Sequence, residues 1–146
     1  MLHDLGADIR PNSRFVTTNR RFEVDGAFAA RDFIRSHRDG RRWDERRVQL
    51  VWDAVAFHSE GRFALFKEVD VEVVYRGNEV DFSGGGVYGI TEAERAGVRA
   101  EFSEGGEGEG VVGFVSWVCR RKPGTTYGEF GFGLLSCVLL FFSELG

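Results

Sequence analysis

The sequence predicts an all-α fold with an irregular, glycine-rich C-terminal part. Apolar side chains recur at the three- and four-residue spacing of an amphipathic helix in residues 22–37 and again from Val48 to Val55. Thr91 is followed three residues later by Glu94, the spacing of a capping box that starts a helix. No stretch offers a partner for an isolated strand, so we expect helices throughout.

The first long helix is predicted to follow a loop. Residues 7–21 contain Pro11, Asn12 and Ser13 and show little apolar periodicity, which is typical of a loop. The periodic segment 22–37 comes next, and Asp39 and Gly40 should end it.

A second helix should begin after Asp44, whose side chain can cap it, and end near Glu60 and Gly61. His58 lies three residues after Val55 and continues the apolar stripe. The imidazole should therefore lie at the C-terminal end of the buried face, where it would be a core histidine bonded to a backbone carbonyl or a loop side chain.

Residues 66–80 fit two patterns. Val69, Val71 and Val73 alternate with polar residues as in a strand, whereas Val69, Val73 and Gly77 also share one face of a helix. We predict a helix, because the neighbouring segments are helical. Asp81 continues that face, so we expect its carboxylate to point inward where the helix ends.

The C-terminal third changes in composition, since fifteen of the twenty glycines fall from Gly84 onward. A helix should run from Thr91 to Phe102, an acidic flexible loop should occupy 103–110, and a last helix should span 111–121. The expected organisation is one domain over 1–127 and a divergent tail over 128–146. The apolar run 134–142 is either a closing core element or an exposed tail.

Composition excludes several classes of protein. A net charge of −4 and a pI near 5.4 argue against nucleic acid as a partner. The run 134–142 is too short to cross a bilayer, so no membrane partner is expected. With Cys119 and Cys137 and no signal peptide, we predict reduced cysteines and a cytoplasmic location. Eleven arginines between Arg10 and Arg47 form either a phosphate-binding patch or a solvated surface.

Four side chains are candidate metal ligands: His3, Asp4, His58 and Asp81. Neutral imidazole together with carboxylate suits zinc, iron or manganese. Adjacent residues on a helix point about 100° apart. His3 and Asp4 can therefore share one ion only from the flank or the frayed end of a helix.

The chain also carries a series of phrases in a characteristic order. They are Leu-His-Asp-Leu-Gly (2–6), Arg-Phe-Glu-Val-Asp-Gly-Ala-Phe-Ala-Ala-Arg (21–31), Val-Trp-Asp-Ala-Val-Ala-Phe-His (51–58), Lys-Glu (67–68), Val-Asp-Phe-Ser-Gly (80–84), Gly-Ile-Thr (89–91) and Trp-Val-Cys-Arg-Arg-Lys-Pro-Gly-Thr-Thr-Tyr (117–127). Together they resemble the HD-domain superfamily, and within it the cyanamide hydratase-like branch.

The resemblance implies an all-helical HD-domain-like bundle that holds a divalent metal. That family binds the ion through an early histidine, a His-Asp doublet and a late aspartate, and the positions here are His3, Asp4 and Asp81. His58 would lie near the site. Many two-metal members carry a histidine about where this chain has Phe22, so a single ion is expected, with zinc first and iron or manganese as alternatives.

The implied activity is the addition of water to a small nitrile such as cyanamide, giving urea, with the ion as Lewis acid. Asp4 would handle the proton, and His58 is a second candidate catalytic residue. Two alternatives stay open: a metal-dependent nucleotide phosphohydrolase, and a non-catalytic HD-like remnant. The expected partners are a small-molecule substrate and, by analogy with related enzymes, a second copy of the chain.

The pattern departs from that family at both ends of the chain. The early histidine of the family lies upstream of the doublet, and only Met1 and Leu2 precede His3 here. We therefore expect an incomplete version of an HD-domain protein, with its first ligand missing and foreign sequence after residue 127.

Overall fold

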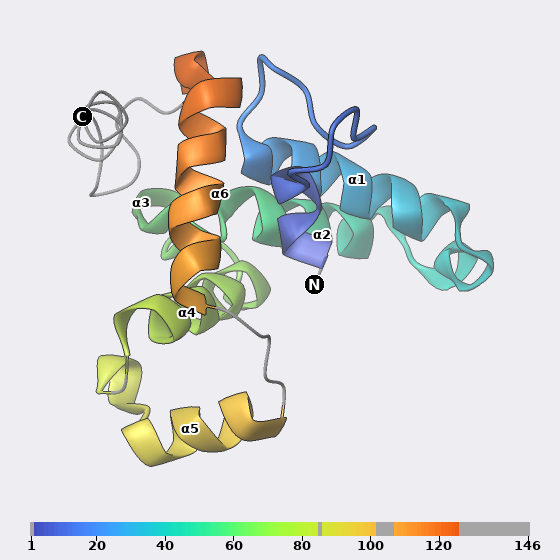
Figure 1. Ribbon diagram of the computed structural model, residues 1–146. Helices are drawn as coiled ribbons and strands as arrows, with labels where there is room; N and C mark the ends of the chain where they lie inside the picture. The colour runs from blue at the N-terminus through green and yellow to red at the C-terminus, as the bar shows by residue number, and fades with distance from the viewer. Residues whose placement is uncertain (1, 85, 102–106, 126–146) are drawn as a thin grey trace, which may run out of the picture.

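The computed structural model describes residues 2–84, 86–101 and 107–125, without the side chains of 2–3 and 107–112 (Figure 1). Within these ranges the chain forms α-helices and short 3₁₀ helices and no strand, so the all-α prediction is confirmed. The α-helices are α1 (Phe22–Ser36), α2 (Glu45–Phe57), α3 (Gly61–Ala64), α4 (Val69–Ser83), α5 (Glu92–Glu101) and α6 (Glu107–Arg121). The 3₁₀ helices are η1 (Leu2–Ala7), η2 (Arg38–Arg42), η3 (Val87–Gly89) and η4 (Pro123–Thr125).

The helices α1 and α2 form the first part of the core and lie side by side in Figure 1. Ala27 and Ala30 of α1 are fully buried and pack against Val55 and Ala56 of α2. Small side chains let two helix backbones approach closely, and this contact fixes the position of the N-terminal half of the chain. Asp44 caps α2 as expected, because its Oδ1 accepts a hydrogen bond from the Arg47 N–H at 2.8 Å.

The second part of the core joins α2 to α3 and α4. Ala54, Ala64 and Val71 form a buried cluster against which Tyr75 packs. Gly61 lies against the hydroxyl end of Tyr75, where a Cβ atom would collide with the phenol. Residues 69–83 are helical, so the helix predicted for the ambiguous segment 66–80 is confirmed from Val69 onward, and the strand alternative is wrong; residues 66–68 precede the helix.

The helix α5, at the lower edge of Figure 1, has no buried side chain. Its capping box is present: the Glu94 N–H donates to Thr91 Oγ1 at 3.3 Å, and the Thr91 N–H donates to Glu94 Oε2 at 2.9 Å. Arg95 attaches it to the end of α4 by donating to the carbonyl oxygens of Val80 and Asp81.

The helix α6 begins at Glu107, so the prediction of a flexible loop over 103–110 is wrong for residues 107–110, and residues 102–106 lie outside the description. Extending an existing helix costs far less than starting one, and acidic residues in a first turn favour the helix dipole. Phe114 of α6 packs edge-on against Phe22 of α1 with ring centroids 4.9 Å apart. The predicted tail 128–146, including the apolar run 134–142, lies outside the described residues.

Cys119 is disulfide-bonded, so the expectation of a reduced thiol is wrong for this residue. Within the described ranges, no helix has both the length and the apolar character needed to cross a membrane.

Candidate functional site

The His-Asp doublet lies on the short helix η1, which packs against α1. The contact is made at Gly6, where a Cβ atom would collide with the Phe22 carbonyl oxygen and lie 2.6 Å from the Gly26 nitrogen. Only glycine allows the two backbones to approach this closely. Asp4 is exposed, and the side chain of His3 is outside the description.

His58 is buried at the C-terminal end of α2, as predicted. Its Nδ1–H donates to the Val55 carbonyl oxygen at 2.7 Å, since a carbonyl can only accept. The ring also packs edge-on against Phe22 with centroids 5.8 Å apart. This geometry confirms a core histidine that is bonded to a backbone carbonyl.

Asp81 points outward, so the prediction that it faces inward is wrong. Its side chain is 62% exposed and lies 3.2 Å from the Arg99 guanidinium of α5. The face that was predicted to be buried is the exposed one: Val69 is 68% and Val73 is 59% exposed, and a Cβ atom on Gly77 would meet nothing within 4 Å. The buried face of α4 instead carries Val71, with Tyr75 packed beside it.

The predicted metal ligands His3, Asp4 and Asp81 stay a prediction. Among the residues that the structure describes, no three or more His, Cys, Asp or Glu side chains are grouped so that they could hold a metal ion. The set of His3, Asp4 and Asp81 includes His3, whose side chain is not described.

A buried carboxylate lies at the start of α1, beside the doublet's helix. Glu23 is fully buried, and its Oε1 accepts hydrogen bonds from the Ser59 hydroxyl and the Arg21 guanidinium, each at 2.5 Å. Ser59 directly follows His58. Glu23 therefore ties the start of α1 to the end of α2, on the same side as the Phe22–His58 contact.

A second buried charge pair joins α1 to the end of α6. Lys122 is fully buried, and its ammonium group lies 2.6 Å from Asp25 Oδ2. The same group donates to the carbonyl oxygens of Thr17 and Arg20, while the Thr17 N–H and hydroxyl donate to Asp25. This network fixes the loop before α1 between two helices.

A third polar pair lies just after His58. Glu60 is buried, and both of its oxygens accept hydrogen bonds from Arg62, at 2.7 and 2.6 Å. The Arg62 guanidinium holds the pKa of Glu60 below its usual range. The Glu60 carboxylate thus stays charged at neutral pH and is already occupied by a cation.

Sequence reasoning missed these buried charged residues. One of them had a local signal: Glu23 precedes Ala27 by four positions and Ala30 by seven, so it continues the apolar stripe of α1. The pairing of Asp25 with Lys122 has no such signal, because the two residues are 97 positions apart.

Comparison with known proteins gives no relative for this chain: no family model, no curated protein and no solved structure matches it.

Proposed function

We propose that this chain is a metal-binding domain of the HD type whose chemistry is the addition of water to a small nitrile. His3, Asp4 and Asp81 are the proposed ligands of one divalent ion, zinc first. When bound, such an ion polarises water for addition to the nitrile carbon. One imidazole and two carboxylates are a donor set that suits zinc.

One observation carries the proposal: four of the phrases that resemble the HD superfamily meet around the first half of α1. Residues 2–6 contact α1 through Gly6. Residues 51–58 reach it through the His58 ring against Phe22, and residues 117–127 reach it through Lys122 on Asp25. Segments separated by up to about a hundred positions thus pack around one helix, which supports their interpretation as parts of one domain.

Two of the proposed ligands, Asp4 and Asp81, and the neighbouring His58 have distinct roles in the proposed site. Asp4 is exposed on η1, so its carboxylate can exchange a proton with water near the ion. Asp81 must exchange the Arg99 ion pair for the metal, and an exposed pair of this kind is worth only about 0–1 kcal/mol. His58 is held by Val55, which fixes its ring for the Phe22 contact.

The test begins with metal content. The purified chain is loaded with zinc, iron(II) or manganese, desalted and measured by mass spectrometry, alongside His3→Ala and Asp81→Asn. Asp70→Asn is the matched control, because Asp70 is an exposed carboxylate at the other end of α4. Both ligand variants should lose at least about tenfold in metal affinity, and the control should not.

Activity is then read by urea release from cyanamide and phosphate release from nucleotides. Metal binding with urea release supports the hydratase. Phosphate release without urea would replace it with the phosphohydrolase. If the wild-type chain retains no metal and forms neither product, the proposal fails and the non-catalytic domain is the remaining reading.

A further inference from the structure

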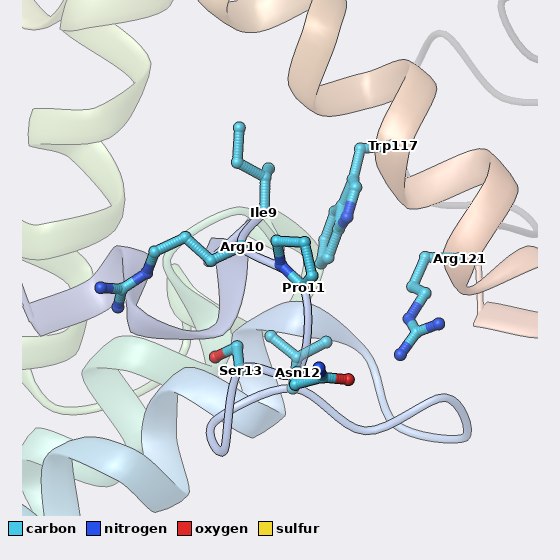
Figure 2. A pocket seen from close by; sticks show the side chains of 8 residues that line it. Ile9, Arg10, Pro11, Asn12, Ser13, Trp117 and Arg121 are labelled. Atoms are coloured by element: carbon cyan, nitrogen blue, oxygen red, sulfur yellow. The ribbon is translucent and has the colours of Figure 1, made fainter.

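A surface pocket of about 260 Å³ lies between the loop that follows η1 and the last turns of α6. Figure 2 shows its two walls: Pro11 and Asn12 come from the loop, and Trp117 and Arg121 come from α6. The Trp117 ring is half-buried and stands beside Pro11, and Val16 adds to the apolar lining. The pocket thus has a flat aromatic wall with polar groups at one side.

The two arginines that line the pocket, Arg10 and Arg121, differ in whether their charge is paired with a carboxylate. Arg10, which also lines it, is committed to Asp8, with Nε 2.7 Å from Oδ1 and Nη2 2.8 Å from Oδ2. In Figure 2 the Arg10 guanidinium points away from Trp117. Asp8 is therefore neutralised, and Arg10 adds little field inside the pocket.

Arg121 is in the opposite situation. Within the part of the chain that the structure describes, its guanidinium makes no ion pair and no side-chain hydrogen bond, and Figure 2 shows it turned toward Asn12. Asn12, in a left-handed turn with φ 62°, also lines the pocket and carries a side-chain amide, which has two N–H donors. A guanidinium and an amide beside an aromatic face are groups that bind a planar anion.

We propose that this pocket binds a small organic carboxylate with a flat apolar body. The carboxylate pairs with Arg121 and accepts a hydrogen bond from Asn12, while the ring lies against Trp117. A single uncompensated cation balances one negative charge, which favours a carboxylate over a phosphate dianion. The volume, below the roughly 300 Å³ of drug-sized pockets, limits the ligand to about one ring and its acid group.

The experiment is a titration of the full, ¹⁵N-labelled chain with benzoate, followed through the Trp117 indole N–H signal, which a Trp117→Phe variant identifies. None of the proposed metal ligands lines this pocket, so the result is independent of metal binding. Because the pocket is open and its charge exposed, we expect a Kd on the order of 1 mM.

Arg121→Gln should weaken benzoate binding about five- to tenfold. Arg120→Gln is the matched control: it removes the same charge from the neighbouring exposed position outside the pocket, and binding should stay within about twofold. Benzamide has the same ring without the charge and should bind about as weakly to wild type as benzoate does to Arg121→Gln.

Three results would overturn the proposal. One is an unchanged Trp117 signal up to about 20 mM benzoate. Another is equal affinity of wild type and Arg121→Gln for benzoate, or of wild type for benzoate and benzamide. The third is inorganic phosphate that displaces benzoate at lower concentration, which would assign the pocket to phosphate.

Discussion

At the scale of single residues, Lys122 is a buried charge whose partners all lie within the described part of the fold. An ammonium group has three N–H donors, and all three acceptors are present: the carbonyl oxygens of Thr17 and Arg20 and the carboxylate of Asp25. A buried charge is tolerated only when it is paired and hydrogen-bonded in this way. The network therefore stabilises the fold only while both charges remain.

Lys122→Met tests this network. The variant keeps the aliphatic stem but leaves Asp25 charged and buried, so the free energy of unfolding in urea should fall by about 3–5 kcal/mol. Arg121→Met, an exposed position on the same turn, should change it by no more than about 0.5 kcal/mol. Adding Asp25→Asn should recover part of the loss, and a loss under about 1 kcal/mol in the single variant would contradict the account.

Gly6→Ala tests the contact that holds the doublet's helix. Its Cβ atom would meet the backbone of Phe22 and Gly26, which cannot move aside as a flexible side chain can, so we expect a loss of about 1–3 kcal/mol in unfolding free energy. Gly77→Ala is the control, and it should change the unfolding free energy in the opposite direction. Nothing lies within 4 Å of its Cβ position in α4, and alanine there should stabilise by about 0.5–1 kcal/mol. Equal changes in unfolding free energy for Gly6→Ala and Gly77→Ala would contradict this explanation.

At the scale of elements, the helices differ in what holds them. The helices α1 and α2 bury alanine and valine against each other. The helix α5 buries no side chain and depends on its capping box and on Arg95 and Arg99, which reach the end of α4. Local contacts of this kind predict a helix that opens without unfolding the core.

Thr91→Ala should open α5 selectively. It removes the hydroxyl that accepts the Glu94 N–H, which costs about 1 kcal/mol of helix stability. Amide hydrogen exchange should accelerate about fivefold in residues 92–101 and remain unchanged in α1 and α2. Uniform acceleration across the chain would show instead that α5 unfolds together with the core.

At the scale of the whole molecule, the free energy of unfolding should decrease at acidic pH. The pKa of Glu60 is lowered by its hydrogen bonds from Arg62, and that of Glu94 by the Thr91 backbone N–H. A group whose folded pKa lies below its unfolded value stabilises the fold above the unfolded pKa, and this contribution is lost as pH falls through the folded pKa.

The unfolding free energy should therefore be level from about pH 7 to pH 5 and should fall as the pH drops below about 4.5, the ordinary range of a glutamate carboxyl. Glu60→Gln should flatten that fall, and Glu68→Gln, an exposed carboxylate nearby, should not. Urea unfolding of the wild type and both variants at pH 7, 5 and 3.5 measures how the unfolding free energy changes with pH. The same slope in Glu60→Gln and in wild type would exclude Glu60 as a contributor.

Across these scales, the sequence by itself determined α1, α2 and the cap that begins α5, whereas α6 begins at Glu107, four residues before its predicted start. The stripe in residues 22–37, the Asp44 cap and the Thr91–Glu94 box all arise from contacts between residues a few positions apart, so a local pattern encodes them. Of the candidate site, this reasoning placed His58 at the buried C-terminal end of the second helix. It gave the wrong direction for Asp81, whose side chain is exposed.

Only the tertiary structure decided which face of α4 is buried and which charges lie inside. The valines of α4 fit two faces, and packing against α2 and α3 selected the one with Val71, which turned Asp81 toward Arg99. Lys122 and Asp25 become a buried pair only when α6 meets α1. A partner so distant along the chain leaves no periodic trace, because the energy of the pair depends on burial that exists only after folding.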